Sequence, residues 1–66
     1  MPQGHTEKML SPVRRAIHGW AFCDRQMLHA RIKQGELARD KLAPTLREQA
    51  DSLIAPLRNA IQRMRA

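Results

Sequence analysis

The chain has 66 residues and carries 12 Lys and Arg side chains against 6 Asp and Glu, which gives a formal net charge of +6. This length allows one small domain and excludes a multidomain enzyme. The single cysteine excludes an intramolecular disulfide framework. No apolar run approaches the roughly 20 residues that a membrane-spanning helix needs, so we expect no membrane span.

The first ten residues show no clear hydrophobic period and contain Pro2 and Gly4. We therefore expect residues 1–10 to form a flexible arm. The same segment lacks the apolar centre of a secretion signal. Cys23 has no partner cysteine, which suits a reducing compartment, and we interpret it as a small buried hydrophobe. These features favour a cytoplasmic protein.

Residues 12–34 have the pattern of a long amphipathic helix. Ser11 and Pro12 are typical of an N-cap followed by the first helical residue. Apolar side chains then recur on one arc at about 100° per residue. Gly19 interrupts this helix and indicates either a close neighbour or a bend. Gly35 follows two polar residues and predicts the end of the helix.

Two further helices are predicted after Gly35. Residues 36–42 form the first, which ends before Pro44 because a proline disfavours helical geometry at the preceding residue. Residues 45–65 form the second, and the helix begins with a Thr-x-x-Glu capping-box spacing. Pro56 lies inside it and predicts a kink or a split.

The last predicted helix carries a heptad pattern of apolar residues, widened by Ile54 and Ile61. We call this row the seam: Leu46, Ala50, Leu53, Leu57, Ala60 and Met64. The seam can pack on the first helix within one chain or pair between two chains, and the sequence leaves both open. A domain this small buries only roughly 60% of the surface that its unfolded chain exposes. We predict an all-α fold, a helical hairpin or small three-helix arrangement, which self-associates or is completed by a partner.

The candidate functional surface is rich in arginine. The excess charge lies toward the two ends of the chain, with +2 in residues 1–22, +1 in 23–51 and +3 in 52–66. On one continuous helix over 12–34, four side chains would share an arc of roughly 60° with no acid: Arg14, His18, Arg25 and His29. The predicted nucleic-acid-binding residues are Arg14, Arg15, His18, Arg25, His29, Lys33, Arg58, Arg63 and Arg65.

Cations that displace counterions from a nucleic acid gain salt-dependent affinity, although the same residues can form an ordinary solvated face. The scarcity of aromatic rings disfavours stacking along single strands, so we expect duplex DNA or structured RNA. The alternative is a protein-binding module, an inhibitor, adaptor or assembly subunit, that docks an amphipathic helix on an acidic or apolar groove of a larger protein. The predicted interface residues are Trp20, Met27, Leu46, Leu53, Leu57 and Met64.

Catalytic chemistry is not expected. His18 and Cys23 are five residues apart on one predicted helix, so their side chains point in different directions and do not form a metal site or an activated nucleophile. The three glycines are isolated, so they form no phosphate-binding loop. We expect a small non-catalytic regulatory or accessory protein, with no cofactor and no metal.

Overall fold

A computed structural model describes residues 2–65, with side chains described from 6 to 64, and over this range the chain is helical with no strand. Three α-helices pack together: α1 (Pro2–Ile17), α2 (Arg25–Asp40) and α3 (Pro44–Arg65). A short 3₁₀ helix, η1 (Trp20–Phe22), lies between α1 and α2. The expected all-α, three-helix arrangement is therefore confirmed.

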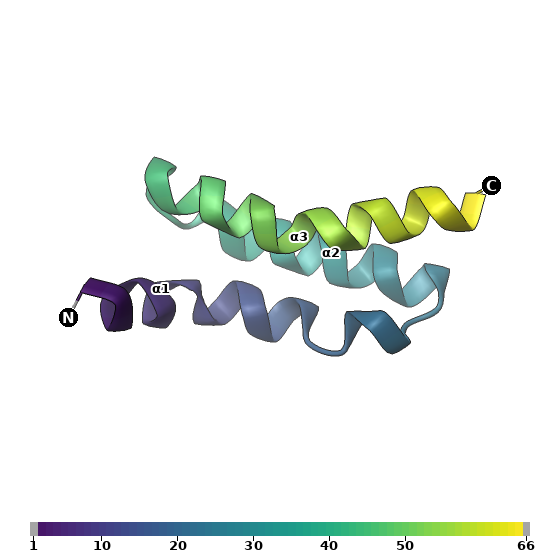
Figure 1. The fold of residues 1–66 in the computed structure, drawn as a ribbon, viewed down its shortest axis with the longest axis horizontal. Coiled ribbons are helices and arrows are strands. Elements are labelled where there is room, and N and C mark those ends of the chain that lie inside the picture. Colours follow the sequence, from purple (N-terminus) through teal and green to yellow (C-terminus); the bar gives the residue numbers. More distant parts are fainter. Residues whose placement is uncertain (1, 66) are drawn as a thin grey trace.

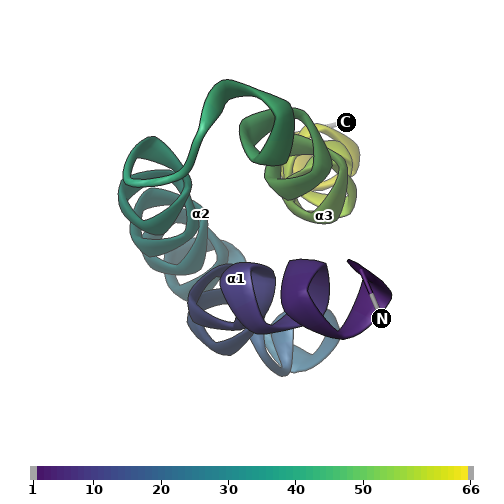
Figure 2. The same ribbon diagram turned by 90° about the vertical axis from the view of Figure 1, so that its left-hand side faces the viewer.

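The bundle is elongated, with extents of 42 × 19 × 17 Å. α1 and α3 run in the same direction, and α2 runs antiparallel to both (Figure 1). Viewed along the bundle, α2 lies beside both other helices, whereas α1 and α3 meet less closely (Figure 2). One side of the bundle, between α1 and α3, is thus the most open.

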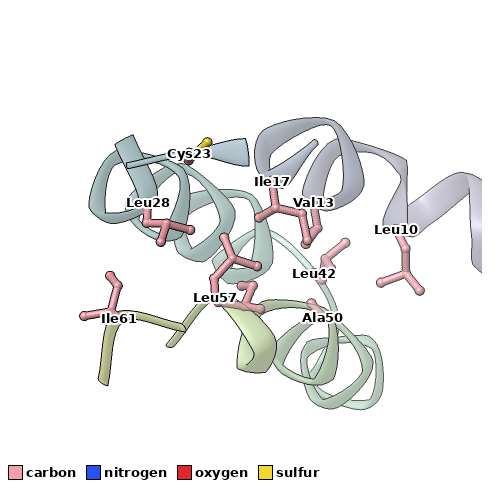
Figure 3. Close-up of a cluster of buried hydrophobic side chains, with 10 residues drawn as sticks. Leu10, Val13, Ile17, Cys23, Leu28, Leu42, Ala50, Leu57 and Ile61 are labelled. Atoms are coloured by element: carbon pink, nitrogen blue, oxygen red, sulfur yellow. The ribbon is translucent and has the colours of Figure 1, made fainter. Parts of the chain in front are cut away.

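The core draws its buried side chains from all three helices and from the two connections (Figure 3). Its largest fully buried members are Val13, Leu28, Ile54 and Leu57. Cys23 is buried and free, as expected of a small hydrophobe. Burying each large aliphatic side chain stabilises the fold by about 1.5–3 kcal/mol. The complete buried set is Leu10, Val13, Ile17, Cys23, Leu28, Leu42, Ala50, Ile54, Leu57 and Ile61.

The expected arm over 1–10 is wrong where the structure describes it, because α1 begins at Pro2 and continues to Ile17. Leu10 is 3% exposed, so this segment contributes to the core. Pro2 stands at the first helical position, where its missing N–H costs no helical hydrogen bond. Ser11 is consequently not an N-cap but an interior residue of α1. Met1 lies outside the described residues.

The single helix predicted over 12–34 is also wrong, because the chain turns between Ile17 and Arg25. Gly19 adopts φ +73°, a left-handed conformation that glycine reaches at no steric cost. Asp24 then begins α2 as its N-cap, and its carboxylate accepts a hydrogen bond of 2.9 Å from the backbone N–H of Met27. The turn folds α1 and α2 back against each other.

Gly35 does not end a helix, as the sequence suggested, but lies buried inside α2. A Cβ placed there would be 3.1 Å from Ile17 Cγ2 and 3.3 Å from Ile54 Cδ1. The absence of a side chain lets α1 and α3 approach α2 at this point. The segment 36–42 is therefore the C-terminal part of α2 and its exit, not a separate helix.

The predicted third helix agrees with α3 to within a residue, although Pro44 rather than Thr45 occupies its start. The helix continues through Pro56, which is exposed, so of the expected kink or split the split does not occur. The buried face of α3 is not centred on the predicted seam but is rotated to one side of it. The buried row is Ala50, Ile54, Leu57 and Ile61, and the half-buried edge beside it is Leu46, Leu53 and Ala60.

Candidate functional site

The contact of Ile17 and Ile54 with Gly35 marks a cross-section through all three helices. On one side lie residues 18–34 and 55–65, which we call the basic half. On the other side lie residues 2–16 and 36–53, which we call the mixed half. In Figure 1 the basic half includes η1, the start of α2 and the end of α3.

The two halves contain equal numbers of Arg and Lys residues but very unequal numbers of acids. The basic half has six cations, namely Arg25, Arg31, Lys33, Arg58, Arg63 and Arg65, and a single acid, Asp24. The mixed half has six cations, namely Lys8, Arg14, Arg15, Arg39, Lys41 and Arg47, and five acids, namely Glu7, Glu36, Asp40, Glu48 and Asp51. The fold therefore gathers a formal charge of +5 at one end, with His18 and His29 beside it.

Three of the six cations of the mixed half are engaged within the molecule, Arg14 and Arg39 with carboxylates and Arg47 with the backbone carbonyl of Leu42. The Arg14 guanidinium lies 3.1 Å from Glu7 on α1. Arg39 donates to Asp51 on α3 at 2.8 Å and to the neighbouring Asp40 at 2.8 Å. These hydrogen bonds, with Asp51 the stronger cause, raise the pKa of the Arg39 guanidinium above its ordinary value. With five acids against six cations, the formal charge of this half is only +1.

Cations of the basic half are mostly free of such partners. Within the described part of the chain, no carboxylate lies at ion-pair distance from the exposed residues Arg25, Lys33 and Arg63. The carboxylate of Asp24 is turned to the N-terminus of α2 as its cap. Arg58 is the exception, because it reaches across the boundary to Glu36 at 2.7 Å.

The fold brings together only some of the residues that the sequence placed on one basic face of a helix over 12–34. The turn after Ile17 separates Arg14, Arg15 and His18 from the rest, and Arg14 is paired with Glu7. The remaining predicted residues of this face lie on α2. There Arg25, His29 and Lys33 are exposed and recur every four residues, about one turn apart on the same side of the helix.

A pocket between α2 and α3 that the sequence did not predict lies beside this row. His29 of α2 and Arg58 of α3 line the same shallow pocket of about 300 Å³, whose other lining residues are Ile32, Ile61 and Gln62. Arg63 is exposed further along α3. The side chain of Arg65, also predicted as a binding residue, lies outside the described side chains.

The predicted interface residues fall into three classes of exposure. Leu57 is fully buried and serves the core of the single chain, so its assignment to an interface is wrong. Trp20, Leu46 and Leu53 are half-buried and pack against the core. Met27 and Met64 are each 46% exposed.

An open pocket of about 510 Å³ lies between the end of α1 and the middle of α3. Ile17, Trp20, Leu53 and Pro56 supply its apolar wall, and polar residues, among them Arg14, lie at its edge. Two of the half-buried interface candidates, Trp20 and Leu53, thus share one groove.

Sequence reasoning missed one residue at the turn, and a second residue that it did not assign to the site lies further along α2. Phe22 is 94% exposed, although its place between two core residues of a supposed helix gave no sign of this. Arg31 is half-buried, and its Nε has no hydrogen-bond partner among the described residues. The available signal was the pair Gly19 and Asp24, a turn residue followed by an N-cap residue, which together enclose η1.

Among the described residues, no group of three His, Cys, Asp or Glu side chains is placed to hold a metal ion. Over the same residues, no helix has the length and apolar character needed to cross a bilayer. Comparison with known proteins gives no match, whether to a protein-family model, to a curated protein or to a solved structure.

Proposed function

We propose that this chain is a small non-catalytic protein that binds nucleic acid, either duplex DNA or structured RNA, through the cations of the basic half. The observation that supports it is the segregation of acids, because five of the six lie in the mixed half. A surface that combines unpaired cations with few carboxylates attracts a polyanion, because few negative side chains repel it.

The row on α2 supplies the central contacts. The Cα atoms of Arg25, His29 and Lys33 span about 12 Å at the α-helical rise. Side chains in such a row contact successive phosphates and release the counterions bound there. Arg58 and Arg63 extend the positive surface onto α3, and the guanidinium fork suits the oxygens of a phosphate group. The pairing of Arg58 with Glu36 leaves Arg63 as the freer of these two.

The binding experiment is a fluorescence-anisotropy titration of duplex DNA and of a base-paired RNA hairpin at increasing salt. We expect log affinity to fall linearly with log salt concentration, with a slope of about −0.9 per phosphate contacted on DNA. The variant Arg25→Glu/Arg63→Glu removes two exposed cations from the basic half. We expect at least a tenfold loss of affinity and a shallower salt slope.

The matched control is Lys8→Glu/Lys41→Glu, which makes the same change in net charge at exposed positions of the mixed half. We expect it to alter affinity far less. Two results would contradict the proposal: wild-type protein that binds neither nucleic acid at low salt, or equal losses in the two variants. Far-UV circular dichroism checks that both variants keep their helices.

The second candidate function is protein binding, and the groove beside Trp20 favours it. Its apolar wall and polar edge would accept an amphipathic helix, either from an acidic larger protein or from a second copy of this chain. The nucleic-acid titration described above distinguishes the two functions. If nucleic acid fails to bind at low salt, protein binding at this groove is the remaining proposal. For either function we propose a cytoplasmic location, because the free Cys23 suits a reducing compartment.

A further inference from the structure

The turn between α1 and α2 holds two aromatic residues in opposite environments. Trp20 packs partly buried against the core, whereas Phe22, two residues later, is 94% exposed. An isolated exposed apolar residue is ordinary on a protein surface. Here, however, the ring is almost completely bare and belongs to the half of the molecule that carries the excess charge.

The turn that carries Phe22 is firmly braced. The backbone N–H of Phe22 donates to the carbonyl of Gly19 at 3.0 Å, and that of Cys23 donates to Trp20 at 3.1 Å. The Cys23 thiol also lies 3.5 Å from the Gly19 carbonyl oxygen and is buried. Asp24 then fixes the start of α2. A ring held on such a turn loses little further backbone freedom when it binds.

We propose that Phe22 stacks on one unpaired base of a structured nucleic acid while the basic half contacts the phosphates of the adjoining duplex. This inference rests on the proposed function and specifies its target. Bases within a regular duplex are already stacked on their neighbours. A protein ring therefore needs a base that is unpaired, as at a bulge or a loop.

The number of bases follows from the aromatic content. The chain has one Trp, one Phe and no Tyr, and Trp20 is held against the core. The other strongly exposed apolar residues in the basic half are methionines. One exposed ring provides one stacking platform, so the expected target has a single unpaired nucleotide beside paired ones, rather than an extended single strand.

The surroundings of Phe22 favour a nucleic acid over a membrane or a protein pocket. A helix that lies on a membrane needs a broad apolar face, and a protein hot spot is surrounded by further apolar contacts. Of the nearest residues on α2, Arg25 and Gln26 are exposed and polar, and Met27 alone adds apolar area. The nearest charged residues along the chain are Asp24, whose carboxylate caps α2, and the exposed Arg25, which can contact a phosphate beside the base.

The test compares two RNA hairpins of the same sequence, one fully paired in its stem and one with a single bulged nucleotide. We expect the wild-type chain to prefer the bulged hairpin about tenfold, in line with the stacking of one base. Phe22→Ala should abolish this preference and leave the affinity for the paired stem unchanged. Phe22→Tyr should restore it. Met27→Ala, which removes an exposed apolar side chain without a ring, should keep it.

Each outcome supports or overturns the inference. Equal wild-type affinity for the two hairpins overturns it and leaves the proposed function intact, whereas no binding to either hairpin removes both. A parallel titration uses vesicles that contain anionic lipid, with Trp20 fluorescence as the signal. Vesicle binding that depends on Phe22, without a preference for the bulge, would assign the ring to a membrane surface instead.

Discussion

The two halves of the bundle carry the same number of arginines and lysines but differ in the number of acids beside them. In the mixed half, Arg39 connects α2 to Asp51 of α3, and Arg14 pairs with Glu7 along α1. In the basic half, Arg25, Lys33 and Arg63 have no such partners among the described side chains. Lys8, Arg15 and Lys41 of the mixed half also lack an ion pair among the described side chains, so the two halves differ in how many acids accompany the cations rather than in how many cations they have.

The two halves share one core, and the largest expected effect comes from breaking it. Ile54 is fully buried at the cross-section where the three helices meet. Ile54→Ala should reduce the free energy of unfolding by about 2–5 kcal/mol, because it leaves a cavity as well as losing burial. A small domain has about 5 kcal/mol in total, so thermal denaturation should show a protein that is largely unfolded or close to it.

The control for Ile54→Ala is Met64→Ala, an exposed apolar residue near the end of the same helix. We expect it to change the free energy of unfolding by less than about 0.5 kcal/mol. If both variants lost the same stability, the two halves would not depend on a common core.

The second prediction sharpens the comparison at Asp24, the single acid of the basic half. Asp24→Ala removes both its charge and the N-cap of α2, and should cost about 1 kcal/mol of stability. Asp24→Asn keeps an N-cap of similar strength and removes only the charge. If the basic half binds nucleic acid, Asp24→Asn should bind more tightly than wild type with nearly unchanged stability. Chemical denaturation and anisotropy measure the two effects, and an affinity that falls in Asp24→Asn would argue against this surface.

The smallest expected effect concerns the mixed half. Asp51→Asn weakens the contact with Arg39 between α2 and α3. Because Asp51 is 45% exposed, the loss should be only about 0.5–1 kcal/mol and should diminish at high salt. Glu48→Gln serves as the comparison, since no ion pair of Glu48 is found among the described side chains. Nucleic-acid affinity should be almost unchanged in both variants, because neither residue belongs to the basic half.

The sequence predicted the part of the fold that depends on local spacing. The seam and Pro44 placed α3 to within a residue, because apolar periodicity and proline geometry act over only a few residues. The same periodicity joined α1 to α2 incorrectly, since Ile17 and Leu28 fit one continuous apolar arc and Gly19 was interpreted as a bend or a close contact within one helix, not as its end. Both residues do enter the core, but from two different helices.

The candidate site was less accessible to sequence reasoning. Counting charge along the chain placed the excess at both ends, because residues 23–51 are nearly neutral on average. The fold divides this segment at Gly35. Arg25 and Lys33 join the basic half, and Asp40 and Asp51 remain in the mixed half. His29 and Arg58 line one pocket only because α2 and α3 are antiparallel.

The sequence by itself determined that this chain is helical, basic and without a disulfide, since helix propensity, charge and cysteine count are properties of the residues alone. The tertiary structure decided that the chain turns at Gly19, that the Phe22 side chain is exposed to solvent and that five of the six acids lie in the mixed half. These features depend on which helices pack together, and a buried glycine at position 35 allows that packing by admitting Ile17 and Ile54 to the same point.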